Sequence, residues 1–265
     1  MSGLIPASQA PIEVAVALVS VAVASIFYSI AARLYRRPVS DTSRLASYQF
    51  SLWWVGIGTV VALNALLILL GLANALPFAL AITLYLVSLI VDCVFLWAIV
   101  GALTYVYTGK YHLLELGAFY FLFYALLLYW AISQDPRAVA LAAGVPSLTF
   151  GTAAVPALSL FVALGLLVPG IVAALLYLSL LRETRDPAIR FRITLVGGSI
   201  LLWFGIEIFV SPGTAGVLLV RTVLEVVPGL LSLIALIPPA WVRRRIGVSV
   251  PVGQEEYYRR KRAPP

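Results

Sequence analysis

The sequence predicts an all-α integral membrane protein built as a seven-transmembrane helix bundle. Of its 265 residues, 62% are hydrophobic and only 11% are charged, and the mean hydropathy is +1.04. A soluble core of ordinary proportions cannot bury so many apolar side chains. Seven apolar stretches also reach the length of about 20 residues with which a helix crosses a hydrocarbon layer of about 30 Å. Finally, the basic residues fall almost entirely on one side of such a bundle.

The first four expected helices follow from apolar stretches separated by short polar connections. The first is rich in Ala and Ser, small residues that suit close approach of another helix. The second opens with Trp53 and Trp54, and tryptophan is enriched where a helix meets the interface between membrane and water. These expected helices cover about residues 14–34, 50–72, 78–105 and 113–132.

The last three expected helices cover about residues 151–181, 193–210 and 216–241. The first of these is overlong, and Pro169 with Gly170 is expected to kink it midway. Pro228 is a further hinge candidate, inside the last helix. The connection at about residues 133–150 has an apolar middle, which either lies on the membrane surface or folds over the bundle as a lid.

The basic residues predict the orientation of the bundle. Sixteen of the eighteen lie in the tail or in the connections after the first, third and fifth expected helices, while Arg137 lies on the other side and Arg221 within a helix. Cytoplasmic loops carry the excess of Lys and Arg, so we expect a multi-pass plasma-membrane protein with its N-terminus outside. The expected domains are an extracellular N-terminus, the transmembrane bundle and a basic cytoplasmic tail, at residues 1–13, 14–241 and 242–265.

The basic tail predicts contact with lipid. Clustered Lys and Arg next to a membrane helix are attracted to the anionic head groups of the cytoplasmic leaflet. No attached soluble domain is expected, so we do not expect a nucleic-acid partner for the same residues. The expected lipid-contact residues are Arg243, Arg244, Arg245, Arg259, Arg260, Lys261 and Arg262.

Polar side chains inside the apolar stretches mark the candidate site. Arg221 and Glu225 lie one turn apart in the last expected helix, where a charge costs about 2.5–3.5 kcal/mol near the helix centre. Such residues normally face a protein interior or a water-filled cavity. Since neighbouring helices carry more polar groups, we expect a partly hydrated pocket in the outer half of the bundle. Its candidate residues are Asn64, Tyr85, Asp92, Trp203, Glu207, Arg221 and Glu225.

Each of these residues also has a structural interpretation. Arg221 pairs with Glu225 or Glu207 and thereby ties the last two helices together, without any ligand. Asp92 is equally well a neutral carboxyl group bonded to a carbonyl or a serine. Trp203 is a packing residue in the same interpretation. The sequence leaves both interpretations open.

Missing residues exclude several cofactors and enzyme classes. Seven helices in this orientation resemble the microbial rhodopsins, which would imply retinal bound through a lysine in the last helix. The only lysines, Lys110 and Lys261, lie in a loop and in the tail, so a retinal Schiff base is excluded. A single histidine, His112, excludes haem held by two axial histidines. With a single cysteine and no zinc, phosphate-loop or prenyltransferase motif, we expect no metal, no cofactor and no enzymatic activity.

Residues 107–110 (YTGK), and residues 190–195 (RFRITL) followed by Gly197, carry a family resemblance. They resemble the seven-helix sensor region that precedes some prokaryotic histidine kinases, over about residues 14–245. The resemblance implies a prokaryotic sensing bundle that passes a conformational change to the cytoplasm. This chain departs from the family because it ends about 20 residues after Trp241 without a kinase. The resemblance therefore implies a separate signalling partner.

Three functional hypotheses follow. The first is a receptor-like or sensor protein with the outer polar pocket. The second is a small-molecule or proton-coupled transporter, in which Asp92 and Glu225 exchange protons and Pro169 and Pro228 allow alternating access. The third is a non-catalytic membrane subunit of a larger complex, whose first helix packs on a protein partner or on a second copy of the chain.

Overall fold

The computed structural model describes residues 10–36, 41–108, 110, 112–142, 145–151, 156–210 and 214–245. Six helices in this part of the chain are long and apolar enough to cross a membrane. The chain is therefore a helical, multi-pass membrane protein in contact with lipid. Its helices are α1 (Ala10–Tyr35), α2 (Asp41–Leu72), α3 (Phe78–Thr108), α4 (Leu113–Ser133), α5 (Pro156–Ser179), α6 (Pro187–Phe209), α7 (Ala215–Leu224), α8 (Val226–Leu236) and α9 (Ala240–Arg245).

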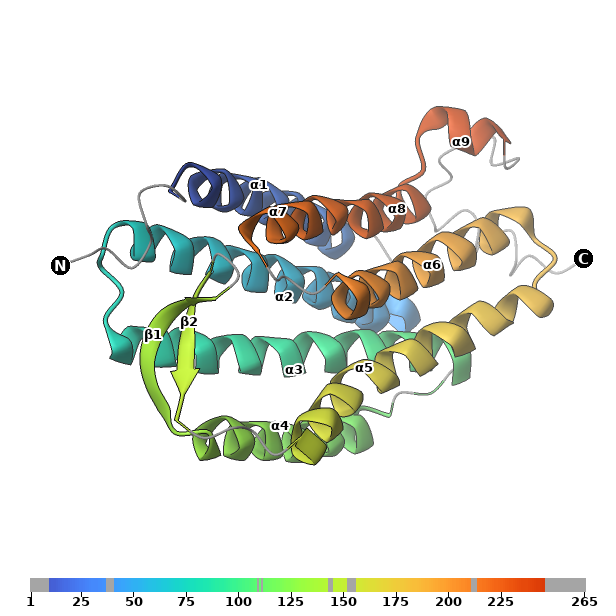
Figure 1. Cartoon of the computed structure of the whole chain (residues 1–265). Helices are drawn as coiled ribbons and strands as arrows, with labels where there is room; N and C mark the ends of the chain where they lie inside the picture. The colour runs from blue at the N-terminus through green and yellow to red at the C-terminus, as the bar shows by residue number, and fades with distance from the viewer. Residues whose placement is uncertain are drawn as a thin grey trace, which may run out of the picture.

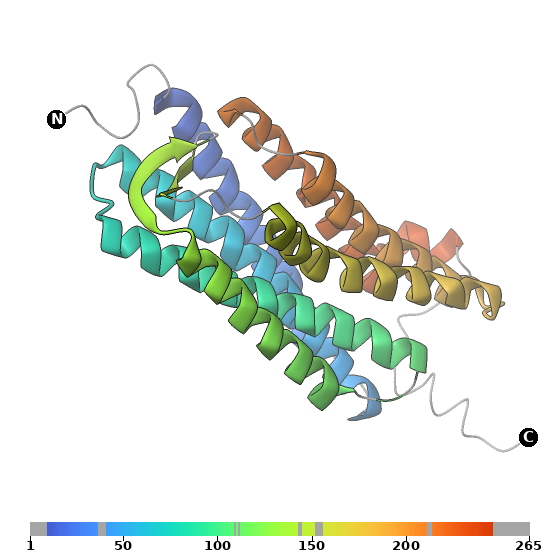
Figure 2. The ribbon, with the colours of Figure 1, turned by 60° about the horizontal axis from the view of Figure 1, so that its bottom comes forward.

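Helices α1 to α4 lie side by side in chain order, and the later helices pack along them (Figures 1 and 2). Helix α5 contacts α3 and α6, while α7 and α8 both contact α1, and α8 also contacts α6. Aromatic rings join the two groups of helices in the core. Phe27 stacks on Trp54 with ring centroids 5.3 Å apart, and Trp53 meets Trp203 edge to face at 6.2 Å. These rings fix α1, α2 and α6 relative to one another.

Helices α1, α2 and α6 begin earlier than the sequence predicts. Helix α2 starts at Asp41, so Trp53 and Trp54 lie about three turns inside it and both are fully buried. The expectation that they mark a membrane interface is therefore wrong, because their rings fill the protein core. Helix α1 starts at Ala10, so residues 10–13 of the expected N-terminal segment belong to the helix. Residues 1–9 lie outside the described part of the chain.

The connection between α4 and α5 is a β-hairpin, which an all-α prediction does not contain. Strands β1 (Pro136–Ala142) and β2 (Val145–Phe150) pair antiparallel, with Val139 opposite Leu148. The backbone N–H of Gly151 closes the base of the hairpin by donating to the carbonyl oxygens of Gln134 and Asp135, at 3.1 and 2.8 Å. The hairpin contacts α2 and α3 and lies across one end of the bundle (Figure 1).

The last apolar stretch is locally irregular at Glu225, between α7 and α8, and α8 ends at Leu236 before Pro238 and Pro239. Pro228 accounts for the irregularity, because it has no backbone N–H to donate to the carbonyl group of Leu224. Glu225 keeps helical backbone angles, with φ −62° and ψ −19°, so α7 and α8 together form one of the six long helices, Gly216–Leu236. The helix expected at residues 216–241 therefore ends earlier, and α9 is a separate short helix.

Helix α5 runs unbroken through Pro169. The next residue, Gly170, is buried, and a Cβ atom there would meet the ring of Phe204 on α6. Gly170 thus allows α5 and α6 to approach closely. This packing role is separate from the hinge role that the sequence predicts for Gly170. The fully described apolar part of this region, Leu167–Arg182, continues α5 into a short 3₁₀ turn and is shorter than the six long helices.

Candidate functional site

A cavity of about 350 Å³ lies between α1, α2, α3, α6 and α7. It occupies the half of the bundle that carries the hairpin. Leu218 near the start of α7 packs there on Val16 near the start of α1 and on Ile68 near the end of α2. The residues around the cavity are Val16, Ser20, Ile57, Val60, Val61, Asn64, Asp92, Phe95, Trp203, Glu207, Leu218, Arg221, Thr222 and Glu225.

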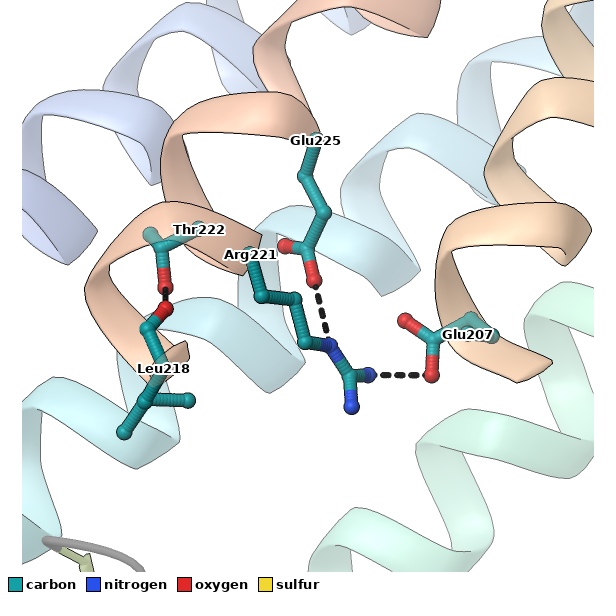
Figure 3. Close-up of polar contacts among 5 residues, drawn as sticks. All are labelled: Glu207, Leu218, Arg221, Thr222 and Glu225. Carbon is teal, nitrogen blue, oxygen red and sulfur yellow. Dashed lines mark hydrogen bonds and ion pairs between the residues drawn. The ribbon is translucent and has the colours of Figure 1, made fainter. Parts of the chain in front are cut away.

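Arg221 forms the centre of the cavity's polar wall. Its Nε donates to Glu225 Oε1 at 3.1 Å, one turn further along the chain, and its Nη2 donates to Glu207 Oε2 on α6 (Figure 3). The three side chains are largely buried, with 19% of Arg221, 23% of Glu207 and 8% of Glu225 exposed. The guanidinium group therefore links two helices through charge-assisted hydrogen bonds at low exposure.

The sequence of α7 directs Arg221 and Glu225 inward. Thr214 caps the helix by accepting a hydrogen bond from the backbone N–H of Val217 at 3.3 Å. Apolar residues of α7 such as Val220 and Val223 are exposed, at 55% and 50%, as expected for a surface that meets lipid. The opposite face of the helix, which carries Leu218, Arg221 and Glu225 on successive turns, therefore faces the cavity.

Helices α3 and α6 each bring one carboxylate and one aromatic ring to the cavity. On α3, Asp92 and Phe95 are three residues apart, and on α6, Trp203 and Glu207 are four apart. These spacings place each pair on one helical face. Helix α6 is held at its start by Asp186, whose carboxylate accepts from the backbone N–H groups of Ala188 and Ile189.

The cavity carries an excess of acidic groups. Among the described residues around it, three bear carboxyl groups and only Arg221 bears a cationic group. If all four were ionised, the site would hold two negative charges in excess. In surroundings with little water, such an excess requires protons or a bound cation. Among the described residues, no group of three or more His, Cys, Asp or Glu side chains is placed to hold a metal ion.

The structure brings together six of the seven pocket candidates, all except Tyr85. Tyr85 packs instead with Leu89 and Cys93 against α4. It lies seven residues before Asp92, which is about 10 Å further along α3. Of the hinge candidates, Pro228 lies close to the cavity, three residues after Glu225. Pro169 and Gly170 are on α5, and neither of them lines the cavity.

The lipid-contact candidates are only partly within the described chain. Arg244 and Arg245 are exposed on α9. The side chain of Arg243 and the residues Arg259, Arg260, Lys261 and Arg262 lie outside the described part.

Sequence reasoning missed several residues that line the cavity. Phe95 has the clearest signal, because it follows Asp92 at helical spacing. Thr222 and Ser20 carry weaker signals, since hydroxyl groups occur at many positions of membrane helices. Glu13 on α1 was also missed. It is fully buried, and neither of its carboxylate oxygens has a hydrogen-bond partner among the described residues. Ser20 is two turns further along the same helical face.

The comparisons with known proteins add no relative. No protein-family model, curated protein or solved structure matches the chain. The function of this membrane protein is therefore argued from its own residues.

Proposed function

We propose that the chain is a receptor-like membrane protein that binds a small polar molecule in the cavity around Arg221. The observation that carries the proposal is the convergence of polar groups from five helices, α1, α2, α3, α6 and α7, on one cavity. Its volume of about 350 Å³ falls in the range of small-molecule sites, which is about 300–1,000 Å³. Polar groups inside membrane helices are costly and commonly mark functional sites.

Binding at this site has a direct route to a conformational change. Arg221 holds α7 to α6 through Glu207, so a ligand that competes for either partner alters the contact between two helices. The junction between α7 and α8 at Glu225 lies in the cavity wall, so a change in the partners of Glu225 acts at this point of the helix. A ligand shifts such an equilibrium only by its difference in affinity for the two arrangements. The proposed output passes through α8 and α9 to a separate signalling partner, as the resemblance to kinase sensor regions implies.

The orientation is part of the proposal. We place the hairpin and the start of α1 outside the cell and α9 in the cytoplasm, with α5 as the seventh membrane crossing. Support comes from the basic residues, because Arg36, Lys110 and Arg185 lie at the end of the bundle away from the hairpin. In this orientation the cavity lies in the outer half of the plasma membrane.

The test is a thermal-shift screen of the full-length protein in lipid nanodiscs against a panel of amino acids, amines, carboxylates and sugars. We expect at least one compound class to raise the midpoint of unfolding in the wild type. Arg221→Lys keeps the charge but loses the forked geometry of the guanidinium group, and it is expected to abolish that shift. Arg137→Lys on the exposed hairpin is the matched control. If no compound shifts the wild type, or if both variants respond alike, the pocket assignment is wrong.

A proton-coupled transporter is the second candidate, and the local irregularity of the helix at Glu225, beside Pro228, favours it. Transporters commonly bind substrate and coupling ions where a membrane helix is discontinuous, near carboxylates such as Asp92 and Glu225. Its test is proton uptake into proteoliposomes that contain a trapped pH-sensitive dye, after addition of a compound from the panel. Uptake that is lost in Asp92→Asn and retained in Glu115→Gln supports transport. Absence of uptake with a compound that demonstrably binds leaves the receptor-like function.

A further inference from the structure

We propose that the ligand of the cavity is a small organic cation, an ammonium group that carries apolar substituents. This inference rests on the proposed function and names the chemical class that the site selects. It follows from the carboxyl groups that line the cavity, from the two aromatic rings beside them, and from the hydrogen bonds that Arg221 already makes.

The carboxylates give the cavity its preference for a positive charge. Asp92 on α3, Glu207 on α6 and Glu225 at the end of α7 line it from three helices. An organic cation bound among these three carboxylates offsets the negative charge that Arg221 alone does not balance. Charge complementarity of this kind also excludes competing anions, because like charges in a site with little water are costly.

The positive charge of Arg221 is already balanced by carboxylates. Two of its five N–H groups donate to Glu225 and Glu207. An anionic ligand would therefore add negative charge to a wall in which carboxyl groups already outnumber the one guanidinium group. Arg221 therefore holds the two glutamates in place and keeps the acidic wall assembled.

Phe95 and Trp203 give the second, independent part of the argument. Their rings line the same cavity and meet edge to face, with centroids 5.7 Å apart and an interplanar angle of 89°. A cation within about 6 Å of a ring face is attracted by the ring's electrons, and cages of aromatic rings bind alkylated ammonium groups. Each ring is one turn from a carboxylate on its own helix, so charge and aromatic surface lie together.

Trp203 lines the cavity with little of its surface exposed. Only 7% is exposed, and its indole N–H has no hydrogen-bond partner among the described residues, as is also true of Trp53, Trp54, Trp97 and Trp130. The unpaired N–H is therefore shared by several tryptophans of the bundle and does not by itself indicate a ligand. The cavity of about 350 Å³ beside the ring has room for a cation with several carbon atoms.

The test compares three probes of similar size on the full-length protein in nanodiscs at low ionic strength. The probes are choline, its neutral analogue 3,3-dimethylbutan-1-ol, and propanoate, and binding is measured by isothermal titration calorimetry. We expect choline to bind at least about tenfold more tightly than the neutral analogue. Trp203→Leu and Phe95→Leu are each expected to weaken choline by about fivefold or more, whereas Trp203→Phe retains most of the affinity. Phe119→Leu on α4 is the control, because Phe119 is 45% exposed and does not line the cavity.

The outcomes separate this inference from the proposed function. Equal binding of choline and its neutral analogue overturns the cation proposal, as does choline binding that neither aromatic variant weakens. If propanoate or a neutral panel compound binds instead and Arg221→Lys abolishes that binding, the cavity is a ligand site for another chemical class. If no probe and no panel compound binds the wild type, both proposals fail.

Discussion

At the scale of single residues, Arg221 balances two carboxylates that face each other across α6 and α7. Arg221→Gln would leave Glu207 and Glu225 without their positive partner. Removing one member of a buried ion pair typically costs about 3–5 kcal/mol, so we expect a lower midpoint of thermal unfolding. The triple variant Arg221→Gln/Glu207→Gln/Glu225→Gln also removes the charges of the two glutamates, and it is expected to recover most of the lost thermal stability. A triple variant as unstable as the single one would show that packing of the Arg221 side chain, and not charge balance, explains the loss.

Glu13 gives a prediction of the opposite sign. A fully buried carboxyl group with no partner among the described residues weakens the fold, because it gives up its contact with water without a compensating bond. We expect Glu13→Leu to raise the free energy of unfolding by about 1–3 kcal/mol. Glu115→Leu is the control, since the Glu115 side chain is 73% exposed and its change should be small. Chemical denaturation in detergent micelles measures both. A destabilised Glu13→Leu variant would mean that the carboxyl group has a favourable interaction in the membrane.

What the sequence predicted at this scale depended on how unusual a residue was in its surroundings. Arg221 and Glu225 were found because charges deep in an apolar helix are rare and costly. Glu13 was missed because it lies at the edge of the first apolar stretch, where a solvated carboxylate is equally reasonable. Phe95 was missed because aromatic residues are common throughout the chain, and only the neighbouring Asp92 distinguishes its position.

At the scale of elements, the contact between α5 and α6 depends on Gly170. A methyl group at this position would meet the ring of Phe204, so we expect Gly170→Ala to destabilise the protein by about 1–3 kcal/mol. Phe204→Leu in the same chain removes the ring and is expected to recover part of the loss, in a double-mutant cycle measured by thermal unfolding. Gly198 on α6 provides the control, because a Cβ there meets no atom within 4 Å. If the two changes simply add, the two residues do not interact.

The ends of the elements were the part of the fold that the sequence predicted least well. Apolar composition gives the centre of a membrane helix, but α2 continues into the polar segment from Asp41, where composition alone gives no boundary. The irregularity at Glu225 has a visible cause in Pro228, yet Pro169 lies inside an uninterrupted helix. Proline therefore marks a candidate break, and packing decides the outcome. The hairpin was not predicted because its Ala, Val and Leu residues are equally common in helices.

At the scale of the whole molecule, composition was sufficient to predict a helical membrane protein. A chain with this share of apolar residues belongs in a membrane, and its described residues form six helices that are long and apolar enough to cross one. The arrangement of those helices did not follow from the sequence, because spans of similar composition pack in many orders. The site followed only in part, since convergence of Asp92, Glu207 and Arg221 requires α3, α6 and α7 to be neighbours around one cavity.

The orientation and the crossing by α5 make one joint prediction, which cysteine labelling tests directly. The native Cys93 is buried, so it is expected to stay unlabelled by a membrane-impermeant maleimide. Arg137→Cys on the hairpin is expected to react in intact cells, whereas Arg185→Cys, before α6, should react only after the membrane is opened. Glu115→Cys at the start of α4 is the matched control and should behave like Arg185→Cys. If Arg137→Cys and Arg185→Cys react from the same side, α5 does not cross the membrane. If Arg185→Cys reacts in intact cells and Arg137→Cys reacts only after the membrane is opened, α5 crosses the membrane but the positive-inside assignment is wrong. The cavity would then lie in the cytoplasmic half of the bilayer.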